Sequence, residues 1–230
     1  MSEEVKSIFL DNITANSKNI LDHHLTGSWK TIFGDENTNI NNDSIVAYWR
    51  LNDDPFTSET LDESGNSHNI TWTNSPDSNS DTPFNVHDTK NTANFNGSND
   101  SGIVADHNDL SFGDGAEDRP FSISFWAKPF LDDPSGQFYN IINKKSSSTT
   151  DIEYAVFFED PENDNLYTIA VILYDATSTP KKYRYVLDEH AITENKWYNI
   201  VITYNGDETD SGEGILVYVN GTKKKNSETE

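Results

Sequence analysis

Aromatic residues placed along predicted strands carry the clearest candidate chemistry in this chain. An aromatic ring can stack on the apolar face of a sugar, while Asn and Asp side chains bond the sugar hydroxyls. Aromatic residues make up 12% of the sequence, and 27 of its 230 residues are Asn. Most of the five tryptophans are expected in the core. The aromatic residues at or near strand positions that could face a groove are Trp72, Trp126, Tyr139, Tyr174 and Tyr183. They predict a carbohydrate-binding surface.

Signatures of catalysis are missing from the sequence. It contains no GxSxG, HExxH, phosphate-loop or GxGxxG motif, so no catalytic residue is predicted. Its six histidines are scattered; only His23 and His24 are adjacent, and adjacent side chains of a regular strand do not converge on one ion. The absence of cysteine excludes disulfides, thiolate metal sites and cysteine nucleophiles. We therefore expect a protein that is not an enzyme.

The charge of the chain excludes two classes of partner. Lys and Arg number 16 against 39 Asp and Glu, which gives a formal net charge of −23. Such a chain has no electrostatic grip on nucleic acid or on anionic lipid. No apolar run approaches the roughly 20 residues that span a bilayer, so no membrane insertion is expected. The N-terminal MSEEVKSIFLDN lacks the basic start and apolar core of an export signal.

β-Strands are expected to position the candidate aromatic residues. From Ile45 onward, short runs in which apolar and polar residues alternate are separated by turn-forming residues. This pattern predicts an all-β protein, an antiparallel β-sandwich. In FSISFWAK, Phe121 and Phe125 share one face while Trp126 lies on the other; both faces of WYNIVITY are apolar, as in a central strand. The strands are predicted at 45–51, 68–73, 91–96, 101–104, 121–128, 138–144, 152–159, 166–174, 182–187, 197–204 and 214–220.

Residues 1–42 differ from the rest and are predicted to form an N-terminal arm, followed by one domain over 43–230. The arm shows no strand period. It is either a loose terminus or a docking segment. The second interpretation rests on apolar residues that a loose tail does not need, which are Phe9, Ile20, Leu21, Trp29, Ile32 and Phe33.

Taken in order, seven segments resemble the concanavalin A-like jelly roll of the laminin G-like family, over roughly residues 44–223. They are SIVAYWRLND, LDESGNSHNITWTN, ANFNGSNDSGIV, RPFSISFWAKP, FYNIINKK, WYNIVITYNG and GILVYVNGTKK. The family normally continues past the VNG turn with strands that close the sandwich. The resemblance therefore implies that closing strands lie in a longer product or come from a neighbouring subunit, because an open sheet edge invites aggregation.

The resemblance also implies a calcium site, since families with this fold often bind Ca²⁺ through loop oxygens, of which the ion needs 6 to 8. The positions carried over are Asp62, Ser64, Asn66, Asn96, Asn99 and Asp100. The alternative is that these residues form plain Asx turns, which are common in acidic β-proteins.

Some relatives of this fold are glycosidases, which the resemblance makes a third possibility. Asp151 and Glu153 have the two-residue step that places both side chains on one strand face. The glycosidase pattern has a third acid two residues further on, where this chain has Ala155. We therefore expect Asp151 and Glu153 to be the solvated start of a strand.

These features together predict a non-enzymatic virion protein of the kind found in bacteriophages, a tail or capsid-decorating component. The absence of an export signal, the absence of cysteine, the arm and the charge of −23 favour it. Its expected partners are other virion subunits, as a homo-oligomer, and a cell-surface glycan; its role would be adhesion or particle reinforcement. The alternative is a glycan-binding module of a larger cell-surface adhesin, and a glycoside hydrolase comes third.

Overall fold

The computed structural model describes residues 45–83, 91–113, 118–130, 138–145, 152–160, 166–175, 181–186, 192–206 and 214–225. The chain divides into two compact units, Met1–Asp106 and His107–Glu230, which are described separately below. The predicted arm, with all six of its docking residues, lies outside the described residues, so the division at residue 42 stays a prediction. No helix in the described ranges is long and apolar enough to cross a bilayer.

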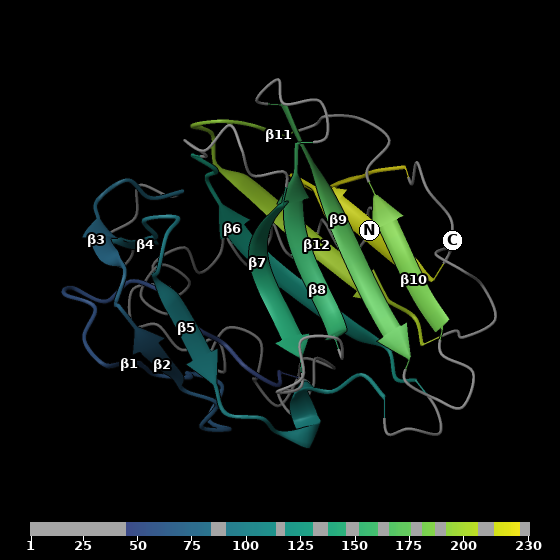
Figure 1. Cartoon of the computed structure of the whole chain (residues 1–230), viewed down its shortest axis with the longest axis horizontal. Helices are drawn as coiled ribbons and strands as arrows, with labels where there is room; N and C mark the ends of the chain where they lie inside the picture. Colours follow the sequence, from purple (N-terminus) through teal and green to yellow (C-terminus); the bar gives the residue numbers. More distant parts are fainter. Residues whose placement is uncertain are drawn as a thin grey trace, which may run out of the picture. The chain divides into compact units, whose positions relative to one another are not determined.

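The first unit is built on two small antiparallel sheets (Figure 1). One has the order β1-β2-β5, formed by Glu59–Thr60, Ile70–Thr73 and Ser101–Val104; the other pairs β3 (Asp77–Asn79) with β4 (Thr92–Asn94). Alternate residues of β2, Ile70 and Trp72, point inward and are buried with Phe56. Trp49, Leu51, Ala93 and Val104 pack against them.

The strand predicted at 45–51 is wrong, because the structure has no strand there. The backbone of this segment is hydrogen-bonded to the turn at residues 62–63 and not to a neighbouring strand. The N–H of Tyr48 donates to Asp62 Oδ1 at 2.8 Å, and the carbonyl of Tyr48 accepts from the N–H of Glu63 at 2.9 Å. Leu51 has a φ of 53°, a left-handed conformation that interrupts a strand.

The second unit is a sandwich of two antiparallel sheets. One sheet has the order β10-β9-β8-β7, with β11 also paired to β9; the other has the order β14-β13-β12-β6. Figure 1 shows β7 to β10 side by side as one layer in front of β6 and β12. The bounds are β6 Phe121–Ala127, β7 Phe138–Lys145, β8 Ile152–Glu159, β9 Leu166–Asp175, β10 Lys181–Val186, β11 Ile192–Thr193, β12 Tyr198–Tyr204, β13 Ile215–Val219 and β14 Thr222–Lys223. The predicted all-β antiparallel sandwich is confirmed.

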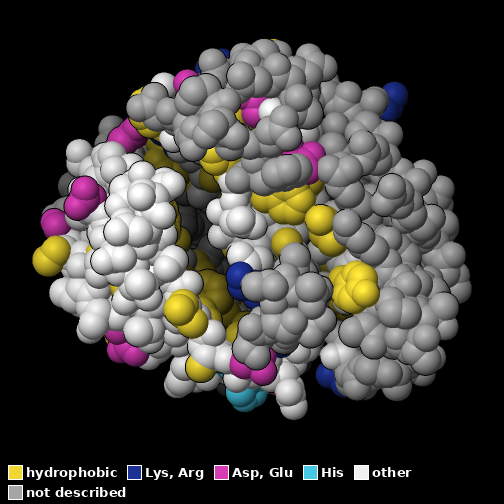
Figure 2. All heavy atoms as spheres, in the orientation of Figure 1, with side chains coloured by type: hydrophobic (Ala, Val, Ile, Leu, Met, Phe, Trp, Pro, Cys, Tyr) yellow, Lys and Arg dark blue, Asp and Glu magenta, His cyan; other side chains and the backbone are white. Residues whose placement is uncertain are grey.

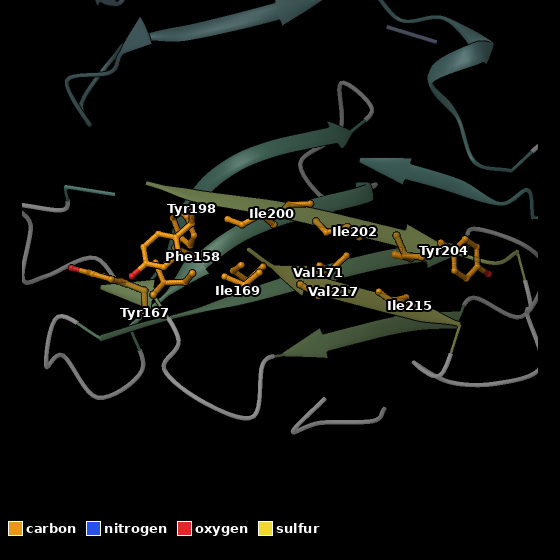
Figure 3. Packing of buried hydrophobic residues seen from close by; sticks show 14 of the residues in the cluster. Phe158, Tyr167, Ile169, Val171, Tyr198, Ile200, Ile202, Tyr204, Ile215 and Val217 are labelled. Carbon is orange, nitrogen blue, oxygen red and sulfur yellow. The ribbon is translucent and has the colours of Figure 1, made fainter. Parts of the chain in front are cut away.

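The core of this unit lies between the two sheets. Figure 3 shows side chains of β8 and β9, among them Phe158, Ile169 and Val171, facing Ile200 and Val217 from β12 and β13. Each fully buried aliphatic or aromatic side chain of this kind stabilises the fold by about 1.5–3 kcal/mol. The burial of β12 alternates strictly, with Tyr198, Ile200, Ile202 and Tyr204 buried, because one face of the strand packs into the core. β12 lies between β13 and β6 in the sheet. It is the central strand that its sequence predicts.

Candidate functional site

The outward face of the β14-β13-β12-β6 sheet carries an unusual set of side chains. The cross-strand register places three rows on this face: Trp126 beside Asn199; Ser124, Val201, Tyr218 and Lys223; and Ser122, Thr203 and Leu216. None of these nine positions holds Asp or Glu, in a chain with 39 acidic residues. We call this set the acid-free face.

Trp126 is the most prominent side chain of the acid-free face. It lies on β6, where the inward residues Phe121, Ile123 and Phe125 pack against the core, so alternation directs the indole outward. The side chain keeps 39% of its surface exposed. An indole of this size, held on a strand and not on a loop, provides a rigid stacking platform.

A turn fixes the polar edge next to Trp126. The Asn199 N–H donates to Asn220 Oδ1 at 2.9 Å, and the Asn220 N–H returns a bond to the Asn199 carbonyl at 2.8 Å. Asn220 and Gly221 both have positive φ, 50° and 76°, as the two central residues of a tight hairpin turn between β13 and β14 require. The Asn-Gly turn therefore holds Asn199 in place beside the indole.

Tyr218 supplies a second ring to the same face. It lies on β13, and β12 separates it from β6. Because neighbouring strands are about 4.8 Å apart, β6 and β13 are about 10 Å apart, and Tyr218 is one row further along the strands than Trp126. Val201 lies between them and pairs with Tyr218. An apolar floor flanked by two rings, with an amide at one edge, suits a ligand that has both apolar faces and hydroxyl groups.

The other predicted sugar-binding aromatics do not join this face. Trp72 is 9% exposed in the core of the first unit, where its Nε1 donates to Thr60 Oγ1 at 2.9 Å and its ring meets Phe56 edge-on at 5.6 Å. Tyr139 packs against the sandwich core, with its ring 6.1 Å from that of Tyr167. The side chain of Tyr183 lies outside the described residues. None of these three residues is therefore shown on one surface with Trp126.

Tyr174 belongs to the outward face of the opposite sheet. Alternation along β9 places it with Ala170 and Ile172, and Phe157 of β8 pairs with Ala170. Ala170 and Phe157 are buried there in a second apolar cluster, although hydrophobic side chains of the described residues do reach the surface in the middle of Figure 2, which looks onto this layer. Tyr174 and Trp126 therefore lie on the two opposite outward faces of the sandwich.

Asp62, Ser64 and Asn66 do come together, but as a turn. The Asp62 carboxylate accepts four bonds, from the N–H groups of Tyr48, Ser64 and His68 at 2.8, 2.9 and 3.0 Å and from the Ser64 hydroxyl at 2.7 Å. Burial by itself would raise the pKa of Asp62, but these bonds outweigh it and lower the pKa below the ordinary 3.8. Asn66 Nδ2 donates to the Ile45 and Val46 carbonyls.

Asn96, Asn99 and Asp100 form a second closed loop. Asn96 Nδ2 donates to Asn99 Oδ1 at 2.8 Å and to Asp100 Oδ1 at 2.9 Å, while the Asn96 N–H donates to Asp100 Oδ2 at 2.8 Å. A calcium ion needs oxygen lone pairs, and here N–H and O–H donors already engage those of both carboxylates. The two loops as arranged do not fit a calcium site, and calcium binding stays a prediction.

Comparison with protein families gives one match. A family model described as the concanavalin A-like lectin/glucanases superfamily matches residues 96–230, more than half of the chain. The chain belongs to this superfamily. The match includes the whole sandwich of the second unit, so the resemblance to a concanavalin A-like fold is confirmed. Comparisons with curated proteins and with solved structures gave no match.

The superfamily's name covers both lectins and glucanases, and the second possibility directs attention to Glu153. Asp151 lies outside the described residues. Glu153 pairs with Lys144 at 3.1 Å and accepts from the Phe112 N–H at 2.9 Å and the Ser111 hydroxyl at 3.2 Å. It connects β8 with β7 and with the segment that leads to β6. Ala155, at the position of the third acid, is 4% exposed. This arrangement is that of a structural carboxylate.

Three residues of the acid-free face, Asn199, Val201 and Tyr218, were not among the predicted site residues. Their strands were recognised from the sequence, and alternation places Asn199 and Val201 on one face of β12. The missing information was the strand order, since Tyr218 shares a face with Trp126 only because β12 pairs with both β13 and β6. In this member of the concanavalin A-like superfamily, the acid-free face can be recognised only once the order of the strands is known.

Proposed function

We propose that this chain is a lectin-like module without catalytic activity, which binds neutral carbohydrate on the acid-free face. The observation that carries the proposal is Trp126, 39% exposed in the middle of an acidic molecule yet surrounded by positions that hold no carboxylate. Ser124 and Asn199 supply a hydroxyl and an amide group next to the ring. Membership in a superfamily that includes lectins is in keeping with this function.

The net charge favours a neutral ligand over an anionic one. With −23 on the whole chain, a polyanionic glycan is repelled before it reaches the face, whatever contacts the face offers. Lys223 is the one charged side chain among the nine residues that define the face, and it lies on the edge strand β14. The rest of the face, including Trp126 on β6 at the other end of the sheet, is therefore left to stacking and to neutral hydrogen bonds.

The contacts of Glu153 favour binding over hydrolysis. Retaining glycosidases need two carboxyl groups about 5–5.5 Å apart that can reach the glycosidic bond. Glu153 has its two oxygens engaged by Lys144, Ser111 and Phe112. Binding without turnover follows, and neutral oligosaccharides should be recovered intact after incubation with the protein.

A glycan array tests the proposal. The full chain is applied to an array that carries neutral and sialylated oligosaccharides, and hits are measured by calorimetry for the wild type, for Trp126→Ala and for Asn143→Ala. Asn143 is the control, an exposed residue of β7 in the opposite sheet. An aromatic contact is worth about 1 kcal/mol or more, so we expect Trp126→Ala to weaken binding about tenfold and Asn143→Ala to leave it within about twofold.

Two results would overturn the proposal. One is a wild-type protein that binds no neutral glycan on the array. The other is binding that Trp126→Ala leaves unchanged while a substitution elsewhere abolishes it. Binding to sialylated glycans alone would overturn the preference for neutral ligands but not the location of the site.

We further propose that the module is displayed on a virion, as a bacteriophage tail or capsid-decorating protein, where it serves adhesion or reinforces the particle. The charge of −23 supports this setting, since it keeps a surface present in many copies from associating nonspecifically. Its partners would be other virion subunits and further copies of this chain. A glycan-binding module of a larger cell-surface adhesin is the competing setting.

Light scattering separates the two settings. The mass of the full chain in solution is measured with and without EDTA. A defined oligomer supports assembly into a particle, and dissociation by EDTA would support bound calcium. A monomer under both conditions favours the adhesin module and contradicts homo-oligomeric assembly.

A further inference from the structure

The chain contains three Asn-Gly pairs, at Asn96, Asn205 and Asn220, and one of them has geometry that promotes a reaction of its own side chain. In an Asn-Gly pair the glycine backbone nitrogen can attack the side-chain carbonyl carbon of the asparagine, because glycine has no Cβ to obstruct the approach. The transition state carries negative charge on Asn Oδ1. A group that donates hydrogen bonds to this oxygen therefore accelerates the attack.

Asn96 Oδ1 has three such donors in the structure. They are the backbone N–H groups of Ser98, Asn99 and Asp100, at 2.8, 3.1 and 3.4 Å. All three come from the chain segment that directly follows the reacting pair, so the loop itself builds the donor set. Backbone donors of this kind are already in position when charge develops on the oxygen.

The rest of the amide is also fixed. Asn96 Nδ2 donates to Asn99 Oδ1 and Asp100 Oδ1, which sets the orientation of the amide plane. The other oxygen of Asp100 accepts from the Asn96 N–H at 2.8 Å, so this carboxylate holds both the backbone and the side chain of the reacting residue. Asp100 is a positioning residue for the amide.

Gly97 leaves the nucleophile accessible. Its φ is +69°, and a Cβ built on it would meet no heavy atom within 4 Å. Asn96 and Gly97 are both exposed. Water and base can therefore reach the Gly97 nitrogen, and water can also reach the cyclic product of the attack.

We propose that Asn96–Gly97 is a site of self-catalysed deamidation, promoted by the folded loop. The Gly97 nitrogen loses its proton to base and forms a bond to Asn96 Cγ. The Cγ–Nδ2 bond breaks, Nδ2 takes up a proton and leaves as ammonia, and a five-membered succinimide remains. Water then opens either C–N bond of the ring, which gives aspartate or isoaspartate at position 96. No oxidant or reductant takes part.

The other two pairs serve as comparisons within the same molecule. From the residues that the structure describes, Asn220 Oδ1 accepts one bond, from the Asn199 N–H. A Cβ at Gly206 would lie 3.0 Å from Pro120 N, so the backbone of the pair at Asn205 is more crowded than that of the pair at Asn96. The predicted order of reaction in the folded protein is Asn96 first, Asn220 second and Asn205 last.

Conversion of Asn96 would open the loop. The product carboxylate replaces the amide that donates to Asp100 Oδ1 and places a like charge beside Asp100. The net charge of the chain moves from −23 to −24. Age-dependent loosening of this loop, which precedes β5, is the expected consequence, and it does not depend on the carbohydrate site.

The test compares folded and unfolded chain. The wild type is incubated in mildly alkaline buffer with and without a denaturing concentration of urea, and deamidation at each Asn-Gly pair is followed by peptide mass spectrometry. In the unfolded chain the three pairs should react at similar rates. On folding, we expect the rate at Asn96 to rise about tenfold, which corresponds to about 1.4 kcal/mol, and the rates at Asn205 and Asn220 to fall.

Asp100→Ala tests the positioning role with an internal standard. It should reduce the folded rate at Asn96 toward the unfolded rate and leave the folded rate at Asn220 unchanged, whereas general loosening of the protein would raise both. Asp100→Asn, which keeps an acceptor oxygen, should restore part of the rate. If folding slows the reaction at Asn96 as it does at Asn205 and Asn220, the proposal is wrong.

Discussion

Trp72 in the first unit and Trp126 in the second both lie on β-strands, but one is buried and the other is exposed. Both lie on short strands whose side chains alternate between two faces. Trp72 is 9% exposed and its indole nitrogen is bonded to Thr60, whereas Trp126 is 39% exposed. The comparison shows that alternation along the strand decides which face a ring takes, and the packing on that face decides whether the ring is buried or stays partly exposed.

Polar groups also differ between the region around Asp62 and the acid-free face. Around Asp62 a carboxylate takes four internal donors and holds the segment before β1 in place. The acid-free face carries no carboxylate at its nine positions. Substitutions around Trp72 and Asp62 should therefore cost stability, and substitutions on the acid-free face should cost binding.

Trp72→Ala gives the largest expected effect. It removes a buried ring that contacts Phe56 and Phe95 and leaves a cavity beside Gly102, whose Cα lies against the indole. We expect the free energy of unfolding of the first unit to fall by about 4 kcal/mol. Urea unfolding measures it. Trp72→Phe is the control and should lose less than half as much; a loss below about 1 kcal/mol for Trp72→Ala would place Trp72 outside the core.

Asp62→Ala comes second and depends on pH. It leaves three backbone N–H groups without their acceptor, so near neutral pH we expect a loss of about 3 kcal/mol. Because the pKa of Asp62 is lower in the folded state than its ordinary 3.8, its contribution is complete above that value and is lost as the pH falls through the folded pKa. The difference between wild type and variant should therefore shrink below about pH 4.

Urea unfolding curves of wild type and Asp62→Ala, measured at a series of pH values below and above 4, test whether the stability difference shrinks as the pH falls. The matched control is Asp77→Asn, an exposed residue of β3, which should leave the acid limb of the wild-type curve in place. A difference between wild type and Asp62→Ala that grows as the pH falls would contradict the assignment.

Glu153→Gln has the third-largest expected effect and tests whether Glu153 acts as a catalytic acid. The substitution keeps the size of the side chain and weakens its bonds to Lys144 and Phe112, so we expect a loss of about 1.5 kcal/mol in urea unfolding. Carbohydrate binding should not change. If the wild type hydrolyses a glycan on the array and the variant does not, the glycosidase interpretation replaces the proposed function.

Much of the fold could be predicted because period-two runs are long in the second unit. The limits of β8, predicted as 152–159, agree with the structure, and the outward position of Trp126 follows from alternation in β6. Strands of two or three residues, such as β1, β3, β11 and β14, are too short to show a period. The failure at 45–51 has a different cause, since the backbone partner of Tyr48 is the side chain of Asp62, fourteen residues away.

The candidate site was harder to predict because it depends on register. Residue type identified Trp126 and Trp72 equally, and nothing local separates them. Asp62, Ser64 and Asn66 lie together in one turn, but composition does not show whether oxygens are turned toward a cation or toward N–H donors. Here the Asp62 oxygens accept from N–H and O–H groups. Tyr218 and Asn199 join Trp126 through pairings with β12 that link residues far apart in the chain.

Trp126→Ala has the smallest expected effect on stability and is the sharpest test of the comparison with Trp72. Part of the indole is already exposed to water in the folded state, so its removal leaves a smaller gap than the removal of the buried ring of Trp72. We expect a loss of about 1 kcal/mol in urea unfolding, about a quarter of that for Trp72→Ala, since an open sheet surface relaxes around the gap. A loss as large as that of Trp72→Ala would show that Trp126 is covered in solution, and the acid-free face would then be a buried contact and not a binding surface.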